Sequence, residues 1–185
     1  MDAFLEEVVT KQNRGTQTAL YILANVIMVI FGALALLDFA TIGAVLQQTG
    51  FSLDFFVVLA RMLVLGAAAF GMFLYRDRVK MEYEYTFTNA QMDFAQVYNN
   101  KKRKNLGTMN IKNVEACGLV SSGSFNRYIN MQGIKRTNWF LNREAELLYF
   151  FFQKDGQKRI IIIEPSEEMT GLIKKTLAQG VWQNN

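Results

Sequence analysis

Two long apolar stretches dominate the first part of the chain. The first, residues 18–37, contains no charged side chain. A helix rises 1.5 Å per residue, so about twenty such residues cross the roughly 30 Å hydrocarbon core of a bilayer. The second stretch runs from Phe55 to Tyr75 and is interrupted by one charge, Arg61. The pattern predicts two transmembrane helices.

A cleaved signal peptide is the competing interpretation of the first stretch. Lys11 and Arg14 lie just before it, and a basic segment also precedes the apolar core of a signal peptide. The stretch is longer than such a core, however, and a second apolar stretch follows at once. We therefore predict that both segments remain in the membrane.

The basic residues beside the apolar stretches predict the orientation of the chain. They lie before the first stretch and after the second: Lys11, Arg14, Arg76, Arg78 and Lys80. The segment between the stretches, Asp38–Gly50, is predicted to be a loop and has no basic residue. Short loops rich in Lys and Arg remain in the cytoplasm. We predict a multi-pass cell-membrane protein with two spans and both termini in the cytoplasm.

The N-terminal segment carries a helical pattern of its own. Within residues 2–13, four apolar residues recur at helical spacing: Phe4, Leu5, Val8 and Val9. This spacing predicts an amphipathic helix that lies on the inner membrane surface. The chain then has three predicted parts: an N-terminal helix at 1–16, a transmembrane hairpin at 17–78 and a soluble domain at 79–185.

Two charges belong to the second apolar stretch. Asp54 and Arg61 share a helix face but lie about 10 Å apart along its axis. One interpretation makes them an intramembrane polar site that serves an ion path or helix pairing. The other, which we favour, places Arg61 near the membrane surface, where its long side chain reaches the headgroups.

Beyond the membrane segments the apolar positions alternate with polar ones, as in half-buried strands. Residues 81–88 place Tyr83, Tyr85 and Phe87 on one face, and a turn at 89–90 leads into a second strand. Five more strands are predicted, at 106–111, 114–120, 137–141, 146–153 and 158–163. The soluble domain is therefore expected to be rich in β-structure.

A C-terminal helix completes the predicted fold. Residues 150–152 and 160–163 are apolar on both faces, which indicates central strands that need a cover on each side. Ser166 is a suitable N-cap for a helix whose apolar face is formed by Met169, Leu172, Ile173 and Leu177. We predict an α+β domain, a sandwich or barrel of about seven antiparallel strands closed by this helix, attached to a membrane helical hairpin.

This outline resembles the bacterial pleckstrin-homology-like (PH-like) domains that are attached to paired transmembrane helices. Four segments are similar to a small, uncharacterised family of membrane proteins from Gram-positive bacteria: MDAFLE at 1–6, EYEYTFTN at 82–89, KKRK at 101–104 and NIKNVE at 110–115. The resemblance covers nearly the whole chain and implies the PH-like fold. Its motifs are structural, so it implies no catalytic residue.

The most basic local feature is a run of four residues, Lys101, Lys102, Arg103 and Lys104. Close to a membrane, such a run can bind anionic headgroups at about 1 kcal/mol per residue. A solvated loop is the alternative, and we favour it. Nucleic acid is disfavoured because no aromatic residues that could stack on bases are interleaved with the run.

A second basic group lies in the Gly- and Asn-rich segment 121–143, which is predicted to be a partly open loop. Arg136 beside Trp139 would form a binding surface if the indole is exposed. A Trp139 buried within a strand would instead belong to the core, and we favour this second interpretation.

The composition excludes several kinds of chemistry. The chain contains no histidine and one cysteine, Cys117, so imidazole metal sites, Ser-His-Asp triads and thiolate metal cages are absent. Cys117 is predicted to be a small buried residue. No carboxylate pair has a spacing that indicates acid–base catalysis, and Gly118–Ser124 lacks the Lys of a phosphate loop. We expect no enzyme, cofactor or metal.

These observations predict a membrane-anchored, non-enzymatic binding or scaffold protein. Its cytoplasmic PH-like domain would meet a protein partner or anionic lipid headgroups. The alternative is an accessory subunit or self-associating component of a membrane transport system, in which Asp54 and Arg61 would be the key residues. The expected partners are the lipid bilayer and a protein, and nucleic acid is not among them.

Overall fold

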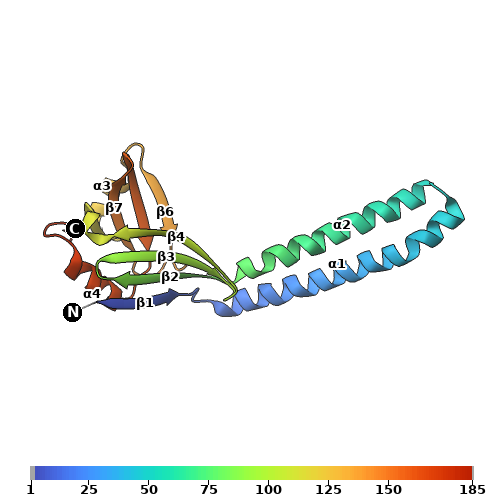
Figure 1. Cartoon of the computed structure of the whole chain (residues 1–185), viewed down its shortest axis with the longest axis horizontal. Helices are drawn as coiled ribbons and strands as arrows, with labels where there is room; N and C mark the ends of the chain where they lie inside the picture. Colours follow the sequence, from blue (N-terminus) through green and yellow to red (C-terminus); the bar gives the residue numbers. More distant parts are fainter. Residues whose placement is uncertain (1–2, 185) are drawn as a thin grey trace. The chain divides into compact units, whose positions relative to one another are not determined.

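The computed structural model describes residues 3–184, which form two units (Figure 1). The helical unit spans Asn13–Lys80. The β-rich unit combines Met1–Gln12 with Met81–Asn185. The chain therefore starts in the β-rich unit, leaves it for the helical unit and then returns.

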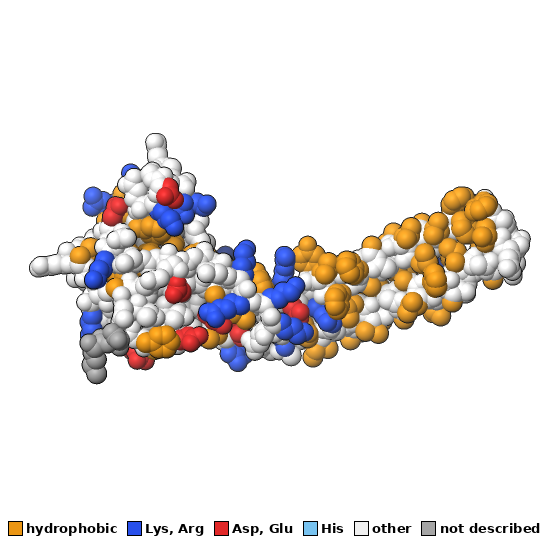
Figure 2. Space-filling view, viewed as in Figure 1, with side chains coloured by type: hydrophobic (Ala, Val, Ile, Leu, Met, Phe, Trp, Pro, Cys, Tyr) orange, Lys and Arg blue, Asp and Glu red, His pale blue; other side chains and the backbone are white. Residues whose placement is uncertain are grey.

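Two helices and a tight turn make up most of the helical unit. α1 (Arg14–Thr49) has 36 residues and α2 (Leu53–Tyr75) has 23, and a short 3-10 helix, η1 (Arg76–Val79), follows. Both α-helices are long and apolar enough to cross a membrane. Apolar side chains are spread along the helical hairpin in Figure 2. The two predicted membrane helices are thus confirmed as helices of spanning length.

The turn between the helices is shorter than the sequence predicted. Asp38–Gly50, predicted to be a loop, is helical as far as Thr49, and that prediction is wrong. The segment contains no proline that would stop the helix earlier. Gly50 has a φ of 61°, a left-handed conformation that glycine adopts without strain, and the helix ends there. Ser52 then caps α2 by accepting a hydrogen bond from the Phe55 N–H.

Sheet A contains four antiparallel strands in the order β1-β2-β3-β4. Their bounds are Phe4–Val9, Met81–Thr88, Gln91–Tyr98 and Lys102–Asn110. Asn89 and Ala90 join β2 to β3 with φ angles of 48° and 75°, and positive φ at both positions is what a two-residue hairpin turn of this kind requires. The predicted hairpin of residues 81–98 is confirmed.

β1 stands where the sequence predicted an amphipathic helix at 1–16. Leu5 and Val9 of this strand lie opposite Phe87 and Tyr83 of β2, so the helix prediction is wrong for residues 4–9. Residues 1 and 2 lie outside the described part of the chain. The short apolar pattern fits a helix and a strand, and an isolated helix of this length is marginal in water. Pairing with the free edge of β2 therefore decides the conformation.

Sheet B contains five strands in the order β6-β8-β7-β5-β9. In chain order, β5 to β9 are Ala116–Leu119, Lys135–Trp139, Leu148–Lys154, Gln157–Ile163 and Trp182–Gln183. β6 runs parallel to β8, and β9 runs parallel to β5. The prediction of about seven antiparallel strands in a closed arrangement is corrected: residues 3–184 form nine strands in two open sheets, and β1 and β9 were not predicted.

The remaining helices are short. They are the 3-10 helix η2 (Ile111–Asn113), α3 (Gly123–Ile129) and α4 (Glu167–Thr176). α3 and β6 occupy much of the segment that was predicted to be an open loop. α4 begins after Ser166, whose Oγ accepts a 3.2 Å hydrogen bond from the Met169 N–H. The predicted N-cap and C-terminal helix are confirmed.

Sheet B is covered on both faces, as predicted for its central strands. The larger core includes side chains from sheet A, from β7 and β8 and from α4: Tyr85, Phe87, Met92, Phe94, Leu148, Phe150, Ile161, Ile163, Met169 and Ile173. A smaller cluster combines side chains of β5, α3, β7 and β8: Ala116, Phe125, Tyr149, Phe151, Ile160 and Ile162. Cys117 is fully buried in the larger core, which confirms its predicted role.

A buried polar residue, Asn142, fixes the segment that follows β1. Its Oδ1 accepts a 2.8 Å hydrogen bond from the Gln12 N–H, and its Nδ2 donates to the Thr10 carbonyl at 3.0 Å. The same Nδ2 donates to Glu164 Oε1 at 2.6 Å. Glu164 Oε2 in turn accepts the backbone N–H of Leu141 and of Asn142. The end of β1 is thereby tied to the loops next to sheet B.

Candidate binding groove and charged sites

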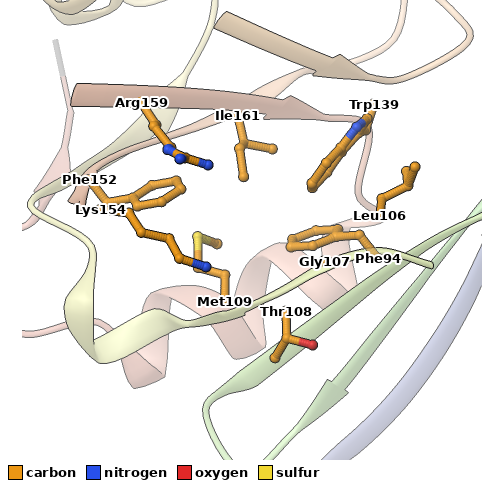
Figure 3. Close-up of a pocket in the computed structure, with 10 residues that line it drawn as sticks. All are labelled: Phe94, Leu106, Gly107, Thr108, Met109, Trp139, Phe152, Lys154, Arg159 and Ile161. Carbon is orange, nitrogen blue, oxygen red and sulfur yellow. The ribbon is translucent and has the colours of Figure 1, made fainter. Parts of the chain in front are cut away.

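A small pocket opens between β4, the edge strand of sheet A, and strands β6, β8 and β7 of sheet B (Figure 3). Its volume is about 100 Å³. Ten residues line it: Phe94, Leu106, Gly107, Thr108, Met109, Trp139, Phe152, Lys154, Arg159 and Ile161. We refer to these ten residues as the β4 groove.

Gly107 is the reason that the groove is hollow. The register of β4 places it opposite the buried Phe94, at a position that faces the interior. A Cβ atom at residue 107 would meet nothing within 4 Å, and the φ of +147° excludes most side chains. A register shift at Phe94 and Ala95 marks a bulge in the ladder. A glycine inside a predicted strand was the available sequence signal for this bulge.

The apolar floor of the groove is a fixed aromatic surface. The Trp139 ring packs on Phe94 at 4.8 Å between ring centroids, and Phe94 meets Tyr85 edge-on at 5.9 Å. The Tyr85 hydroxyl donates a hydrogen bond to the Trp139 carbonyl. Burial raises the pKa of Tyr85, so this donor keeps its proton at neutral pH. Trp139 is half-buried: it packs against the core and also lines the groove.

Two cations lie at one end of the groove. Lys154 of β7 and Arg159 of β8 extend their side chains into it in Figure 3. Arg159 Nη2 lies 4.0 Å from the Asp155 carboxylate, which is a weak contact because Asp155 is largely exposed. Arg159 Nε is buried and has no hydrogen-bond acceptor among the described residues. The groove thus combines an apolar floor with a positive end that has unused donor capacity.

Arg136 and Trp139 are not brought together. In the register of β6, Trp139 lies opposite Ile163 of the larger core, and Arg136 lies opposite Ile160 of the smaller cluster. The two side chains therefore point to opposite faces of the sheet. Arg136 is exposed, and its Nε donates a 3.0 Å hydrogen bond to Asn138 Oδ1. Trp139 joins the β4 groove, and Arg136 does not.

The basic run occupies the β3–β4 turn and the start of β4. Lys102 lies opposite Tyr98, and Tyr98 lies opposite Met81, the first residue after the helical unit. Adjacent strands are about 4.8 Å apart, so Lys102 lies roughly 10 Å from the point where the chain returns from that unit. Arg103 Nη2 lies 2.9 Å from Glu84 Oε2 in an ion pair, and the side chains of Lys102, Arg103 and Lys104 are all exposed. We call Lys101–Lys104 the basic end of sheet A.

The helical unit contains an ion pair that the sequence did not reveal. Arg61 Nε donates to Asp38 Oδ2 at 2.9 Å, and Arg61 Nη2 donates to Asp38 Oδ1, so the contact is bidentate. The Asp38 side chain is 6% exposed and that of Arg61 is 61% exposed. Asp54, which one of the two sequence interpretations grouped with Arg61 in a polar site, is exposed in the first turn of α2. Asp38 was not predicted as a site residue because its segment was assigned to a loop.

A second polar contact joins η1 to α1, where Arg76 donates to the side-chain oxygen of Asn25. In sequence, Asp38 lies about midway between Asn25 and Gly50. At 1.5 Å per residue along α1, the ion pair is roughly 20 Å from Asn25 and roughly 20 Å from Gly50. Arg61 therefore lies near the middle of the apolar hairpin, where Leu34, Leu37 and Leu65 line a small cavity beside the pair.

Two further observations concern chemistry. Burial raises the pKa of the Cys117 thiol, so this side chain is protonated and unreactive at neutral pH. In residues 3–184 no group of three or more His, Cys, Asp and Glu side chains is arranged to hold a metal ion.

Comparison with known proteins gives a single family. A family model described as bacterial PH-like domain (DUF6106) matches residues 1–183. No curated protein and no solved structure matches the chain. The matched range includes both the helical unit and the β-rich unit.

Proposed function

The chain belongs to this bacterial PH-like domain family, and from that membership we propose that it is a membrane-anchored binding protein without enzymatic activity. α1 and α2 anchor it in the cell membrane, and the β-rich unit faces the cytoplasm with both termini. Two features support this orientation. Basic residues flank the apolar helices and are missing from the α1–α2 turn. In addition, β1 and β2 pair with each other, which puts both ends of the hairpin on one side.

The basic end of sheet A is the observation that carries the proposal. Lys102 and Lys104 are exposed, and they lie close to the residue that follows the membrane hairpin. A charge within a Debye length of an anionic leaflet gains about 1 kcal/mol. Arg103 contributes less because it is already paired with Glu84. Anionic headgroups would therefore hold the PH-like domain by this end, while other parts of the domain remain available to a partner.

Amine-reactive footprinting of the full chain tests this contact. The protein is placed in nanodiscs of zwitterionic phosphatidylcholine, with or without phosphatidylglycerol, and the modification rate of each lysine is read by mass spectrometry. We expect Lys102 and Lys104 to react about fivefold more slowly in the anionic discs, as a gain of about 1 kcal/mol implies.

Lys158 is the internal control because it is exposed on β8 in the same unit. Its rate should not change with lipid composition. Equal rates for Lys102, Lys104 and Lys158 in both kinds of disc would refute the headgroup contact. The full chain is required because β1 belongs to the β-rich unit, and a fragment that starts at residue 79 lacks this strand.

A role in membrane transport is the second candidate, and the Asp38–Arg61 pair is the observation that favours it. Ionisable residues within a span often mark ion paths or sites of helix association. Here the pair lies near the middle of the apolar hairpin, with the arginine side chain largely exposed. Under this proposal the hairpin is an accessory or self-associating component of a transport system.

Ion flux in vesicles tests the second candidate. A transport role predicts a flux that changes when Arg61 and Asp38 are both replaced by leucine, a change that removes the charges together. Absence of flux in both the original chain and the double variant would count against a transport role and would leave the anchoring role intact.

A further inference from the structure

We propose that the β4 groove binds an extended polypeptide segment of a partner protein, with an acidic side chain two residues away from an apolar one. The inference rests on the proposed role as a binding protein and names the chemistry of its partner. It uses a part of the β-rich unit that is separate from the basic end of sheet A.

The free edge of β4 can accept an added strand. Sheet A ends at β4, and no strand among residues 3–184 pairs with its other side. The outward N–H and C=O groups of an edge strand can pair with an added strand, which supplies affinity through main-chain hydrogen bonds. In β4 the groove residues Leu106–Met109 form part of this edge, so a strand added there passes directly over the pocket.

The size of the pocket fits one side chain of such a strand. It lies where Gly107 supplies no side chain, and its floor is formed by Phe94 and Trp139. A volume of about 100 Å³ suits a single apolar side chain. The acyl chain of a bilayer lipid would need a longer cavity. In a strand, side chains two residues apart point to the same face, so one side chain enters the pocket and its second neighbour meets the next surface along the groove.

The positive charge at that next surface favours an acidic side chain. Lys154 and Arg159 extend into the groove, and the Arg159 Nε is a buried donor without an acceptor among the described residues. A buried donor that lacks a partner is costly, and a carboxylate supplies an acceptor with two oxygens. An acidic side chain two residues from the apolar one would satisfy this donor and would neutralise the two cations.

A peptide array tests the proposal with defined probes. Immobilised octapeptides of Thr and Ser carry, at two positions two residues apart, all pairs drawn from Glu, Asp, Lys, Leu, Phe and Ser. The labelled full chain in detergent micelles is applied to the array. We expect peptides that pair an acidic with an apolar residue to retain about tenfold more protein than those that pair Lys with an apolar residue.

Charge reversal at the groove distinguishes specific binding there from nonspecific binding of the chain to the peptides. Lys154→Glu changes an exposed residue at the end of β7, so the fold should survive, and the acidic preference should be lost or become a preference for Lys. Arg159→Glu should also abolish or reverse the acidic preference. If Arg159→Glu unfolds the chain, Arg159→Lys, which keeps the positive charge, should keep the preference. Lys158→Glu is the matched control, because it adds the same charge on the opposite face of β8 and should leave the preference unchanged.

Three outcomes would overturn the inference. They are the absence of any preference for acidic–apolar pairs, the same preference in Lys154→Glu, and loss of the preference in the Lys158→Glu control. Soluble dihexanoyl phosphatidylglycerol provides a further arm, because displacement of bound peptide by this lipid at micromolar concentration would make a lipid the occupant instead. Footprinting at Lys102 and Lys104 is independent of the array, so failure of one experiment can be told from failure of the other.

Discussion

Two arginine–carboxylate pairs in this protein share their chemistry and differ in their surroundings. Arg61 and Asp38 join α2 to α1 in the apolar hairpin, and Arg103 and Glu84 join β4 to β2 in sheet A. The two arginine side chains are almost equally exposed, at 61% and 59%. The exposed part of Arg103 meets water, whereas that of Arg61 meets hydrocarbon when the hairpin spans a bilayer.

The exposed area of a charged side chain does not by itself determine how much its ion pair contributes to stability. Water solvates both charges when a surface pair separates, so such a pair contributes little to stability. Hydrocarbon solvates neither charge, and a pair that loses one partner leaves the other without compensation. The loss of stability on breaking a polar contact should therefore be smallest in water, larger in the protein interior and largest in hydrocarbon. Four substitutions test this order, from the largest expected effect to the smallest.

Asp38→Leu should have the largest effect. Arg61 loses both of its hydrogen bonds and remains as a single charge in the apolar hairpin. The full chain in bicelles should unfold in SDS at least about tenfold faster than the original chain, as measured by circular dichroism. Replacement of both Asp38 and Arg61 by leucine should restore most of the lost resistance. If the double variant unfolds as fast as Asp38→Leu, the unpaired charge of Arg61 in hydrocarbon is not the cause of the destabilisation.

Asn142→Ala should have the next largest effect, because it breaks contacts in the protein interior. The Gln12 N–H, the Thr10 carbonyl and one oxygen of Glu164 all lose a partner. The loss should be about 2 kcal/mol in the free energy of unfolding of the β-rich unit. Denaturant titration of the full chain in micelles measures it, and hydrogen exchange should accelerate in β1. Asn138→Ala, on the exposed side of β6, is the control and should change neither quantity.

Tyr85→Phe should cost about 1 kcal/mol, because it removes the hydrogen bond from the hydroxyl to the Trp139 carbonyl and the weaker one, 3.4 Å long, that the hydroxyl accepts from the Glu164 N–H. Burial raises the pKa of Tyr85 above its usual value of 10.0. The unfolded chain therefore ionises first as pH rises, and the stabilisation that is present below pH 10 is lost above it. Denaturation midpoints should fall more steeply above pH 10 in the original chain than in Tyr85→Phe. If the denaturation midpoint falls equally steeply with pH in both chains, ionisation of Tyr85 is not the cause of the loss of stability.

Glu84→Gln should have the smallest effect. It removes the charge that pairs with Arg103, whose side chain is 59% exposed, so water and salt replace the contact on the arginine side. The free energy of unfolding should change by about 0.5 kcal/mol or less, and the difference should disappear in 1 M salt. A larger change that salt does not reduce would place this pair with the buried contacts and would weaken the comparison.

The sequence was most informative where one local pattern agrees with the tertiary structure. β2 was predicted with the observed bounds because Tyr83, Tyr85 and Phe87 alternate with polar residues over the whole strand. α4 was predicted because Ser166 and the apolar face at Met169 and Ile173 give the same answer. Long apolar runs likewise predicted α1 and α2. In each case the local signal and the packing require the same conformation.

The sequence was least informative where distant residues decide the outcome. β1 depends on the free edge of β2, and its short pattern fits two periods. Asp38 was assigned to a loop because a charge ended the apolar run, although Arg61 on the facing helix allows the helix to continue. The β4 groove depends on one glycine, Gly107, and on two cations from other strands. Such pairings bring together residues that lie far apart in the chain.

The insertion of the hairpin between β1 and β2 has a consequence for biogenesis. The ribosome delivers β1 first, then both membrane segments, and only afterwards the strand with which β1 pairs. With the proposed membrane anchoring, β1 remains unpaired until the second segment has entered the bilayer and β2 has been synthesised. A hairpin that inserts with one segment alone would leave β1 and β2 on different sides of the membrane. Under the proposed anchoring, the Val9–Tyr83 pairing therefore forms only when both ends of the hairpin lie on the same side of the membrane.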